Sequence, residues 1–263
     1  PEWLVQHDVN PAERLLANPN KLYSKIELVG FLRNKYGENI QAFNQSWNTG
    51  FDSFEELYTP MEGADQLSPE AEKDLREFRD ILIKKYADVP NQALKDVDPV
   101  HMSLGMRYAS ITEEDFSGAN IYDLFSFNCY RQSPSEKFDL ALKHVDKPII
   151  VGEWHIGGSD KGLYANGLVC SSTQEERGKC CAYYMQTAMF YTNCIGIHYF
   201  EWNDQPLLGR FDGENMQHGL IDVCNKPHYA CVEKMQETSL KMYEILNGEI
   251  PPTKETGVYV KRY

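Results

Sequence analysis

The spacing of apolar residues divides the chain into a helical part and a part in which strands and helices alternate. Apolar residues recur at helical spacing over residues 22–32 and 40–47. A serine followed by proline and acidic residues is typical of a helix N-terminus, and it predicts a helix over residues 68–86. Nothing in this part has the pattern of a buried strand. Residues 1–98 are therefore predicted to form a helical segment.

Beyond residue 98 the pattern alternates between apolar runs and amphipathic stretches. Short runs rich in β-branched and aromatic residues predict strands, and the longer stretches predict helices. The predicted strands cover residues 100–109, 122–130, 148–155 and 194–202, and the predicted helices cover residues 135–144, 173–193 and 227–246. Strands that alternate with helices indicate a parallel α/β arrangement. Residues 247–263 are predicted to form an extended C-terminal tail.

The four predicted strands are too few to close a barrel of eight. An open doubly wound sheet is one alternative, but no Gly-rich phosphate-binding loop follows any predicted strand. We therefore expect a (β/α)8 TIM barrel of which this chain holds roughly the second half, with residues 99–246 supplying strands 5–8 and their helices. Because the chain begins at Pro1, the first half would come from an upstream segment or from another chain that completes the barrel.

Composition and charge restrict the classes of partner. The 263 residues are 42% hydrophobic and carry a formal net charge of −13, which argues against nucleic acid and anionic membrane surfaces. The sequence indicates no metal site and no organic cofactor, and no cysteine pair has zinc-ligand spacing. The sequence leaves room for one or two disulfides and leaves the redox compartment open, with a lean towards a secreted or periplasmic location. The cysteines that could form those disulfides are Cys170, Cys180, Cys181, Cys224 and Cys231.

The most informative segment is residues 147–158, in which an apolar run ends in a carboxylate between aromatic and imidazole side chains. Catalytic residues of (β/α)8 barrels lie at the C-terminal ends of the strands. A glutamate there, Glu153, is the expected nucleophile of a retaining glycosidase. The other interpretation is an acidic strand-end residue held in a salt bridge.

Polar and aromatic side chains occur at the ends of all four predicted strands. Aromatic rings stack on the apolar faces of sugars, and amide, imidazole, guanidinium and carboxylate groups hydrogen-bond to sugar hydroxyls. Parallel strands end at one edge, so the sequence predicts a sugar site there. The residues concerned include Arg107, Asn128, Tyr130, Glu153, His155, His198, Tyr199 and Trp202.

Two motifs, at residues 152–157 and 204–215, make the chain resemble the β-agarase family of glycoside hydrolases and, more loosely, the wider clan of retaining (β/α)8 glycosidases. The resemblance covers roughly residues 99–243. It implies a retaining enzyme that cleaves a β-linked, galactose-containing, agarose-like polysaccharide or oligosaccharide, with Glu153 as the nucleophile. The residues that it implies for substrate binding are Arg107, Asn128, Tyr130, His155, His198, Tyr199, Trp202, Asp204, Gln205, Asp212, Glu214 and Asn215.

The chain departs from the family pattern at two places. Tyr199 stands where tryptophan is usual, and Trp202 where tyrosine is common. The clan places its acid/base in an Asn-Glu pair, which we expect immediately before Pro1, with Glu2 a weak substitute. Two alternatives stay open at this stage. One is another β-galactoside or β-glucoside as substrate, and the other is a non-catalytic carbohydrate-binding or structural protein with the same cleft.

Overall fold

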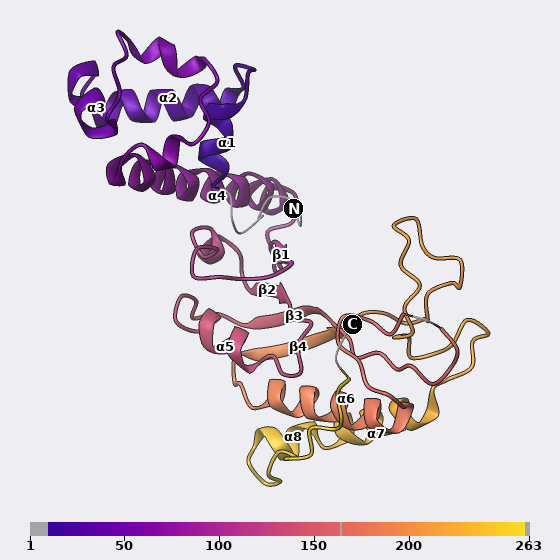
Figure 1. Cartoon of the computed structure of the whole chain (residues 1–263). Coiled ribbons are helices and arrows are strands. Elements are labelled where there is room, and N and C mark those ends of the chain that lie inside the picture. Colours follow the sequence, from indigo (N-terminus) through magenta and orange to yellow (C-terminus); the bar gives the residue numbers. More distant parts are fainter. Residues whose placement is uncertain (1–9, 164, 261–263) are drawn as a thin grey trace. The chain divides into compact units, whose positions relative to one another are not determined.

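The computed structural model describes residues 10–163 and 165–260 (Figure 1). The chain forms two compact units that divide between Val100 and His101. Each unit has its own cluster of buried apolar residues. Among the described residues, no helix combines the length and the apolar character that crossing a membrane requires.

In the part of the first unit that the structure describes, from residue 10 onward, the regular elements are all helical. Its helices are α1 (Pro11–Ala17), α2 (Tyr23–Lys35), α3 (Ile40–Trp47) and α4 (Pro69–Val97), with 3-10 turns at Phe54–Tyr58 and Ala64–Gln66. Asn10, Asn39 and Ser68 accept hydrogen bonds from amides in the first turns of α1, α3 and α4, which satisfies donors that have no partner inside a helix. Trp47 and Leu75 are among the fully buried residues of its core.

Helix α4 is longer than the sequence pattern predicts, since it continues to Val97 instead of ending near Tyr86. It passes through Pro90, which is exposed. A proline inside a helix removes one backbone hydrogen bond. The residues around it are mostly good helix formers, so the helix continues to Val97.

The second unit contains a four-stranded parallel sheet in the order β1-β2-β3-β4. The predicted α/β class with a parallel sheet is therefore confirmed. The strands are β1 (Arg107–Tyr108), β2 (Phe125–Asn128), β3 (Ile149–Trp154) and β4 (Cys194–Tyr199). The helices are α5 (Ser135–Ala141), α6 (Gln174–Met189), α7 (Tyr229–Leu240) and α8 (Met242–Leu246), with a 3-10 turn at Ala119–Ile121.

Two predicted elements were wrong in extent. The strand predicted over residues 100–109 is reduced to two residues, because Gly105 has a left-handed φ of 69° and most of the residues before it are exposed. The predicted helix over residues 227–246 is two helices that meet at Lys241, whose φ of −94° and ψ of 6° end α7. In each place the backbone conformation of one residue ends a strand or helix that the apolar pattern alone would continue.

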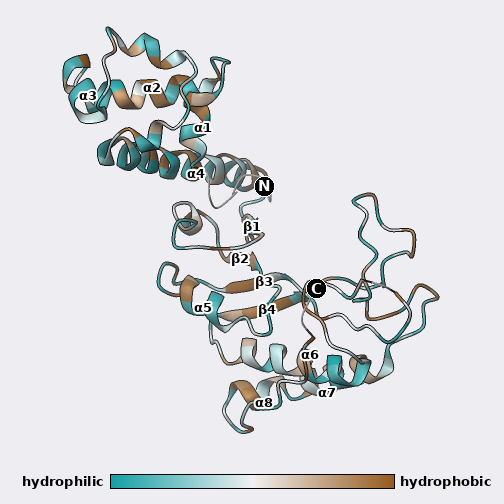
Figure 2. Ribbon diagram, viewed as in Figure 1, coloured by the Kyte–Doolittle hydropathy of each residue, from teal (hydrophilic) through white to brown (hydrophobic). Residues whose placement is uncertain are grey.

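One face of the sheet packs against the apolar cluster, and the other face carries several polar side chains. Val151 and Trp154 belong to the buried cluster, and Trp154 stacks on Tyr184 of α6 with ring centroids 4.3 Å apart. Figure 2 shows β3 as a largely apolar strand, with α6 on one side of the sheet. The other face carries Ser126 and Asn128 of β2, which are buried but lie outside the apolar cluster.

A β-bulge at the end of β3 decides which face its last residues occupy. Phe127 pairs with Val151, but the next residue, Asn128, pairs with Glu153, so Gly152 is an extra residue. A bulge of this kind re-aims the side chains that follow it. Here Trp154 stays on the apolar face with Val151, and the Glu153 carboxylate meets groups of the polar face.

Candidate active site

The carboxylate of Glu153 lies at the carboxyl end of β3 and is held by three donors from neighbouring segments. Its Oε1 is 2.5 Å from Nη1 of Arg107 on β1. Its Oε2 accepts hydrogen bonds from Asn128 Nδ2 at 2.8 Å and from the Tyr130 hydroxyl at 2.5 Å. Oε2 thus accepts two hydrogen bonds, and Oε1 forms an ion pair with the guanidinium. The side chain is 12% exposed, so the group is anchored and still reaches the surface.

Gly152 makes room for this arrangement. A β-carbon at position 152 would lie 2.5 Å from Cγ and 2.6 Å from Cδ of Arg107, and 3.0 Å from Oδ1 of Asn128. Real β-carbons do not approach other atoms that closely. The absence of a side chain at the bulge therefore allows the Arg107 side chain to lie against β3 and reach Glu153.

His155 supports the loop that follows β3. Its Nε2 accepts a hydrogen bond from the backbone N–H of Leu168 at 2.8 Å, so Nδ1 carries the proton that it donates to the Phe200 carbonyl at 3.1 Å. Its ring lies 4.7 Å from that of Tyr130 and 4.2 Å from that of His218. His155 therefore packs against Tyr130, one of the donors to Glu153, while its nitrogens bond to the backbone.

Arg177 of α6 connects the segments that follow β3 and β4. It is fully buried, and its guanidinium donates to the Ile156 carbonyl at 2.6 Å and to the Tyr199 hydroxyl at 2.7 Å. It also donates to the carbonyls of His218 at 2.5 Å and Gly219 at 2.7 Å. All of these partners are neutral oxygens.

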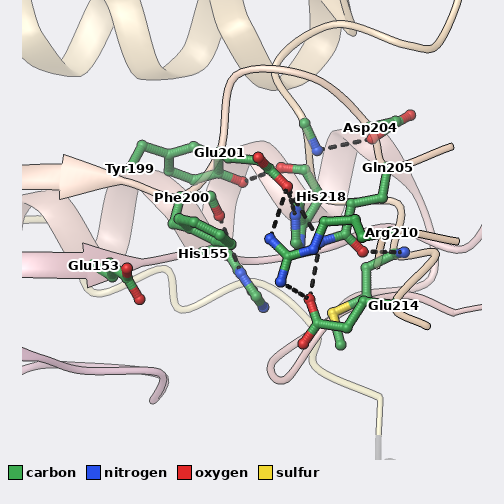
Figure 3. Close-up of polar contacts among 12 residues, drawn as sticks. Glu153, His155, Tyr199, Phe200, Glu201, Asp204, Gln205, Arg210, Glu214 and His218 are labelled. Atoms are coloured by element: carbon green, nitrogen blue, oxygen red, sulfur yellow. Dashed lines mark hydrogen bonds and ion pairs between the residues drawn. The ribbon is translucent and has the colours of Figure 1, made fainter. Parts of the chain in front are cut away.

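Tyr199 lies at the end of β4 with its hydroxyl turned toward the protein. The hydroxyl accepts from Arg177 and lies 3.0 Å from the Ile156 carbonyl and 2.8 Å from the His218 carbonyl. Burial raises the pKa of this hydroxyl. Its ring meets that of Trp154 edge-on at 4.9 Å. Tyr199 thus contributes its ring and its backbone to the strand end, and its hydroxyl bonds to Arg177. Figure 3 shows this hydroxyl directed toward His218.

Asp204 and Gln205 have their polar atoms engaged within the protein. Asp204 accepts from the Gly219 N–H at 2.8 Å and lies 2.8 Å from Nε2 of His228. The Gln205 Oε1 accepts from the Met216 N–H at 2.7 Å. Both residues are buried, at 5% and 2% exposure, and their hydrogen bonds hold the loop that follows β4 in place.

A cluster of charged residues centres on Arg210 in the same loop. The guanidinium lies 2.5 Å from Asp212, 3.0 Å from Glu214 and 3.8 Å from Glu201. The hydrogen bond from Arg210 lowers the pKa of Asp212. In Figure 3, Glu153 lies apart from the carboxylates that surround Arg210.

The structure thus places the expected site residues in different settings. Arg107, Asn128 and Tyr130 bind the Glu153 carboxylate, and His155 packs beside them. The others belong to the end of β4 and its loop. In that second group Trp202 is 65% exposed, His198 is exposed, and Asn215 donates to the Leu207 carbonyl at 3.4 Å. Glu2, the substitute considered for the acid/base, lies outside the described residues.

Two residues of this region escaped the sequence analysis. Glu201 follows β4 and is 3.2 Å from Gln205 Nε2 and 3.5 Å from His218 Nε2. As a carboxylate at a strand end, it could have been found by the argument that selected Glu153. His218 is fully buried, and burial, followed by the nearby charges of Arg177 and Arg210, lowers its pKa to about 3. No sequence motif signals that burial.

All seven cysteines are free, so the disulfides that the sequence allowed are not formed. The sulfur atoms of Cys181 and Cys231 lie 3.9 Å apart between α6 and α7, which is a contact and not a bond. Among the residues that the structure describes, no three or more His, Cys, Asp or Glu side chains are grouped to hold a metal ion.

Comparison with known proteins finds relatives among the glycoside hydrolases. The family profile Glyco_hydro_42, described as Beta-galactosidase, matches residues 24–149. Beta-agarase B of Vibrio sp. (strain JT0107) is 32% identical over 225 residues, which are 84% of this chain and 24% of the relative. Beta-agarase A of the same organism is 28% identical over 230 residues, or 84% of this chain and 23% of the relative.

Solved structures agree with the sequence matches. The crystal structure of an agarase, AgWH50C, superposes with a TM-score of 0.82 at 31% identity and covers 89% of this chain and 34% of that one. A structure described as an exo-beta-agarase superposes with a TM-score of 0.83 at 29% identity and covers 89% and 32%. The chain thus spans about a quarter of the curated relatives and about a third of these solved chains. By sequence and by structure, most of this chain is similar to a part of the β-agarases, which are glycoside hydrolases.

Proposed function

We propose that the chain supplies the nucleophile half of a retaining glycoside hydrolase that cleaves β-linked, galactose-containing polysaccharide or oligosaccharide of the agarose type. The observation that carries this proposal is the Glu153 carboxylate, which ends a parallel strand and is held by Arg107, Asn128 and Tyr130. The names of the relatives, which are β-agarases, support the substrate class.

In the proposed reaction an oxygen of Glu153 attacks the anomeric carbon of the bound sugar. The bond from that carbon to the leaving oxygen breaks, and a second carboxyl group gives the leaving oxygen its proton. Water, activated by the same second group, then attacks the glycosyl-enzyme and releases Glu153 as a carboxylate. The donors around Glu153 hold it in one orientation before the sugar binds, which lowers the entropic part of the barrier.

The sheet geometry supports the further proposal that this chain provides strands 5–8 of a (β/α)8 barrel. The four strands are parallel and follow one another in chain order, as neighbouring barrel strands do. Among the described residues, β1 pairs only with β2, and β4 only with β3. In the proposed barrel these two edges pair with further strands, and the acid/base lies in the part that precedes Pro1.

The replacement Glu153→Gln tests this function. It removes the nucleophile but keeps the shape of the side chain, and an amide oxygen still accepts from Asn128 and Tyr130. Assayed on agarose oligosaccharides with the full natural chain, the variant should lose activity by on the order of 10³-fold or more. The affinity for the oligosaccharides should change little.

The matched control is Glu175→Gln, which changes an exposed carboxylate in the first turn of α6. It should keep the activity of the parent protein. A parent protein that binds these sugars but hydrolyses none of them would contradict the proposed enzyme and favour a non-catalytic carbohydrate-binding protein.

A further inference from the structure

The hairpin that follows β4 exposes apolar side chains almost completely. Leu208 is 98% exposed, Phe211 is 99% exposed and Leu207 is 58% exposed. All three lie within the loop that joins Gln205 to Met216, beyond the ends of β3 and β4 (Figure 1). Clustered, exposed apolar side chains are typical of surfaces that bind a ligand or another protein.

The hairpin is held in one conformation by bonds of its own. At its base the Gln205 N–H donates to the Met216 carbonyl at 3.1 Å. Near its tip the Arg210 N–H donates to the Glu214 carbonyl at 2.8 Å, and Gly213, with a φ of 87°, makes the turn. The exposure of Phe211 is therefore a property of an ordered loop.

Arg210 also ties this tip to the end of β4. Its guanidinium bonds to Asp212 and Glu214 within the hairpin, and it lies 3.8 Å from Glu201. The same guanidinium lies 5.8 Å from the centre of the Phe211 ring and 5.6 Å from that of Phe200. The position of the Phe211 ring is thereby linked to the strand end.

We propose that Phe211 is a stacking platform for a sugar ring of the polysaccharide, at a subsite away from the bond that is cleaved. This inference rests on the proposed function. An aromatic face stacks on the apolar face of a pyranose, and the neighbouring Asp212 and Asn215 offer groups that can bond to its hydroxyls. The hairpin follows the carboxyl end of β4, and Glu153 lies at the carboxyl end of the adjacent β3. A polymer that runs over these strand ends can meet both.

A second copy of the chain is a poorer occupant for this surface. A stable protein interface buries about 800 Å² on each partner, whereas one aromatic side chain buries about 150–250 Å². The hairpin tip offers one ring and two leucines. A sugar ring needs only a surface of that size.

The test compares the affinity for a short and a long agarose oligosaccharide, a disaccharide and an octasaccharide, by titration calorimetry. All variants carry Glu153→Gln, so that the sugars are bound and not consumed. Phe211→Ala should weaken binding of the octasaccharide by about 5- to 10-fold and leave the disaccharide unaffected. Phe211→Tyr, which keeps an aromatic face, should retain the affinity for both.

The matched control is Phe190→Ala, which removes another exposed phenylalanine, 71% exposed at the end of α6. It should change neither affinity. Equal affinity of Phe211→Ala and its parent for the octasaccharide would overturn the inference. So would a change in the oligomeric state of Phe211→Ala, measured by light scattering, without a change in affinity. If the parent binds neither sugar, the proposed function itself fails, and this inference fails with it.

Discussion

At Gly152 the backbone of β3 and the side chain of Arg107 approach so closely that no β-carbon fits between them. The glycine is also the extra residue of the bulge that brings Glu153 opposite Asn128. One residue without a side chain therefore decides both the direction of Glu153 and the access of Arg107 to it.

Replacing Gly152 should lower the activity and leave the protein folded. In Gly152→Ala the new methyl group would displace Arg107 from Glu153, because it would lie 2.5 Å from Cγ of Arg107. A misplacement of about 1 Å in a catalytic group can cost on the order of 10²-fold in rate. We expect kcat/KM to fall by about that factor while the protein stays folded by circular dichroism.

The control for that experiment is Gly50→Ala, where nothing lies within 4 Å of the added β-carbon and φ is not left-handed. It should leave kcat/KM unchanged. Full activity in Gly152→Ala would show that the contact between Arg107 and Glu153 is not needed.

His218 should make the stability of the protein depend on pH. Its pKa is lowered from 6.5 to about 3, mainly by burial, and the groups that face it include His155, Glu201, Arg177 and Arg210. Between these two pKa values the unfolded chain binds a proton at this residue and the folded chain does not. The free energy of unfolding should therefore fall as the pH is lowered, by about 1.4 kcal/mol per pH unit from this residue.

Urea denaturation between pH 6.5 and pH 4.5 measures this dependence. The slope of the unfolding free energy against pH reports how many more protons the unfolded chain binds. His218→Gln should reduce that number by about one, whatever its effect on absolute stability. His198→Gln, which replaces an exposed histidine on β4, serves as the comparison and should keep the parent slope. Equal slopes for His218→Gln and the parent would mean that His218 is protonated in the folded protein.

At the scale of elements, helix α6 holds the strand ends through Arg177. Its buried guanidinium donates to the carbonyl of Ile156 in one segment and to those of His218 and Gly219 in another, and so helps to satisfy buried polar groups of both. Each unsatisfied buried polar group costs about 1–3 kcal/mol.

Arg177→Met should therefore lower the free energy of unfolding by on the order of 3 kcal/mol or more, as measured by urea denaturation. Lys234→Met on α7 is the control, because its exposed pair with Glu237 at i,i+3 contributes only about 0.2–0.5 kcal/mol. A loss in Arg177→Met no greater than in Lys234→Met would show that the Arg177 network does not stabilise the strand ends.

The strands also show how much of the fold and of the site can be predicted from the sequence. Apolar runs located all four strands, and because parallel strands end at one edge, Arg107, Asn128 and Tyr130 could be expected near Glu153. The bulge at Gly152 could not be predicted, since it depends on the pairing of β3 with both neighbours. The internal partners of Asp204 could not be predicted either, because His228 lies 24 positions away in the chain.

At the scale of the whole molecule, the chain consists of two units with separate cores, and the site described above belongs to the second unit. The chain spans only part of its relatives. The central claim, that Glu153 forms a bond to the sugar, is therefore best tested by an experiment that identifies the residue directly and does not depend on the rate of turnover.

That experiment is covalent labelling of the full natural chain with a 2-deoxy-2-fluoro β-galactoside that carries a good leaving group. The fluorine slows breakdown of the glycosyl-enzyme, so a retaining nucleophile accumulates the label. Peptide mass spectrometry should find one sugar on the peptide that contains Glu153, and Glu153→Gln should remain unlabelled. A label on another carboxylate, such as Glu201, or steady hydrolysis of a β-galactoside without any label, would contradict the assignment of Glu153 as the nucleophile.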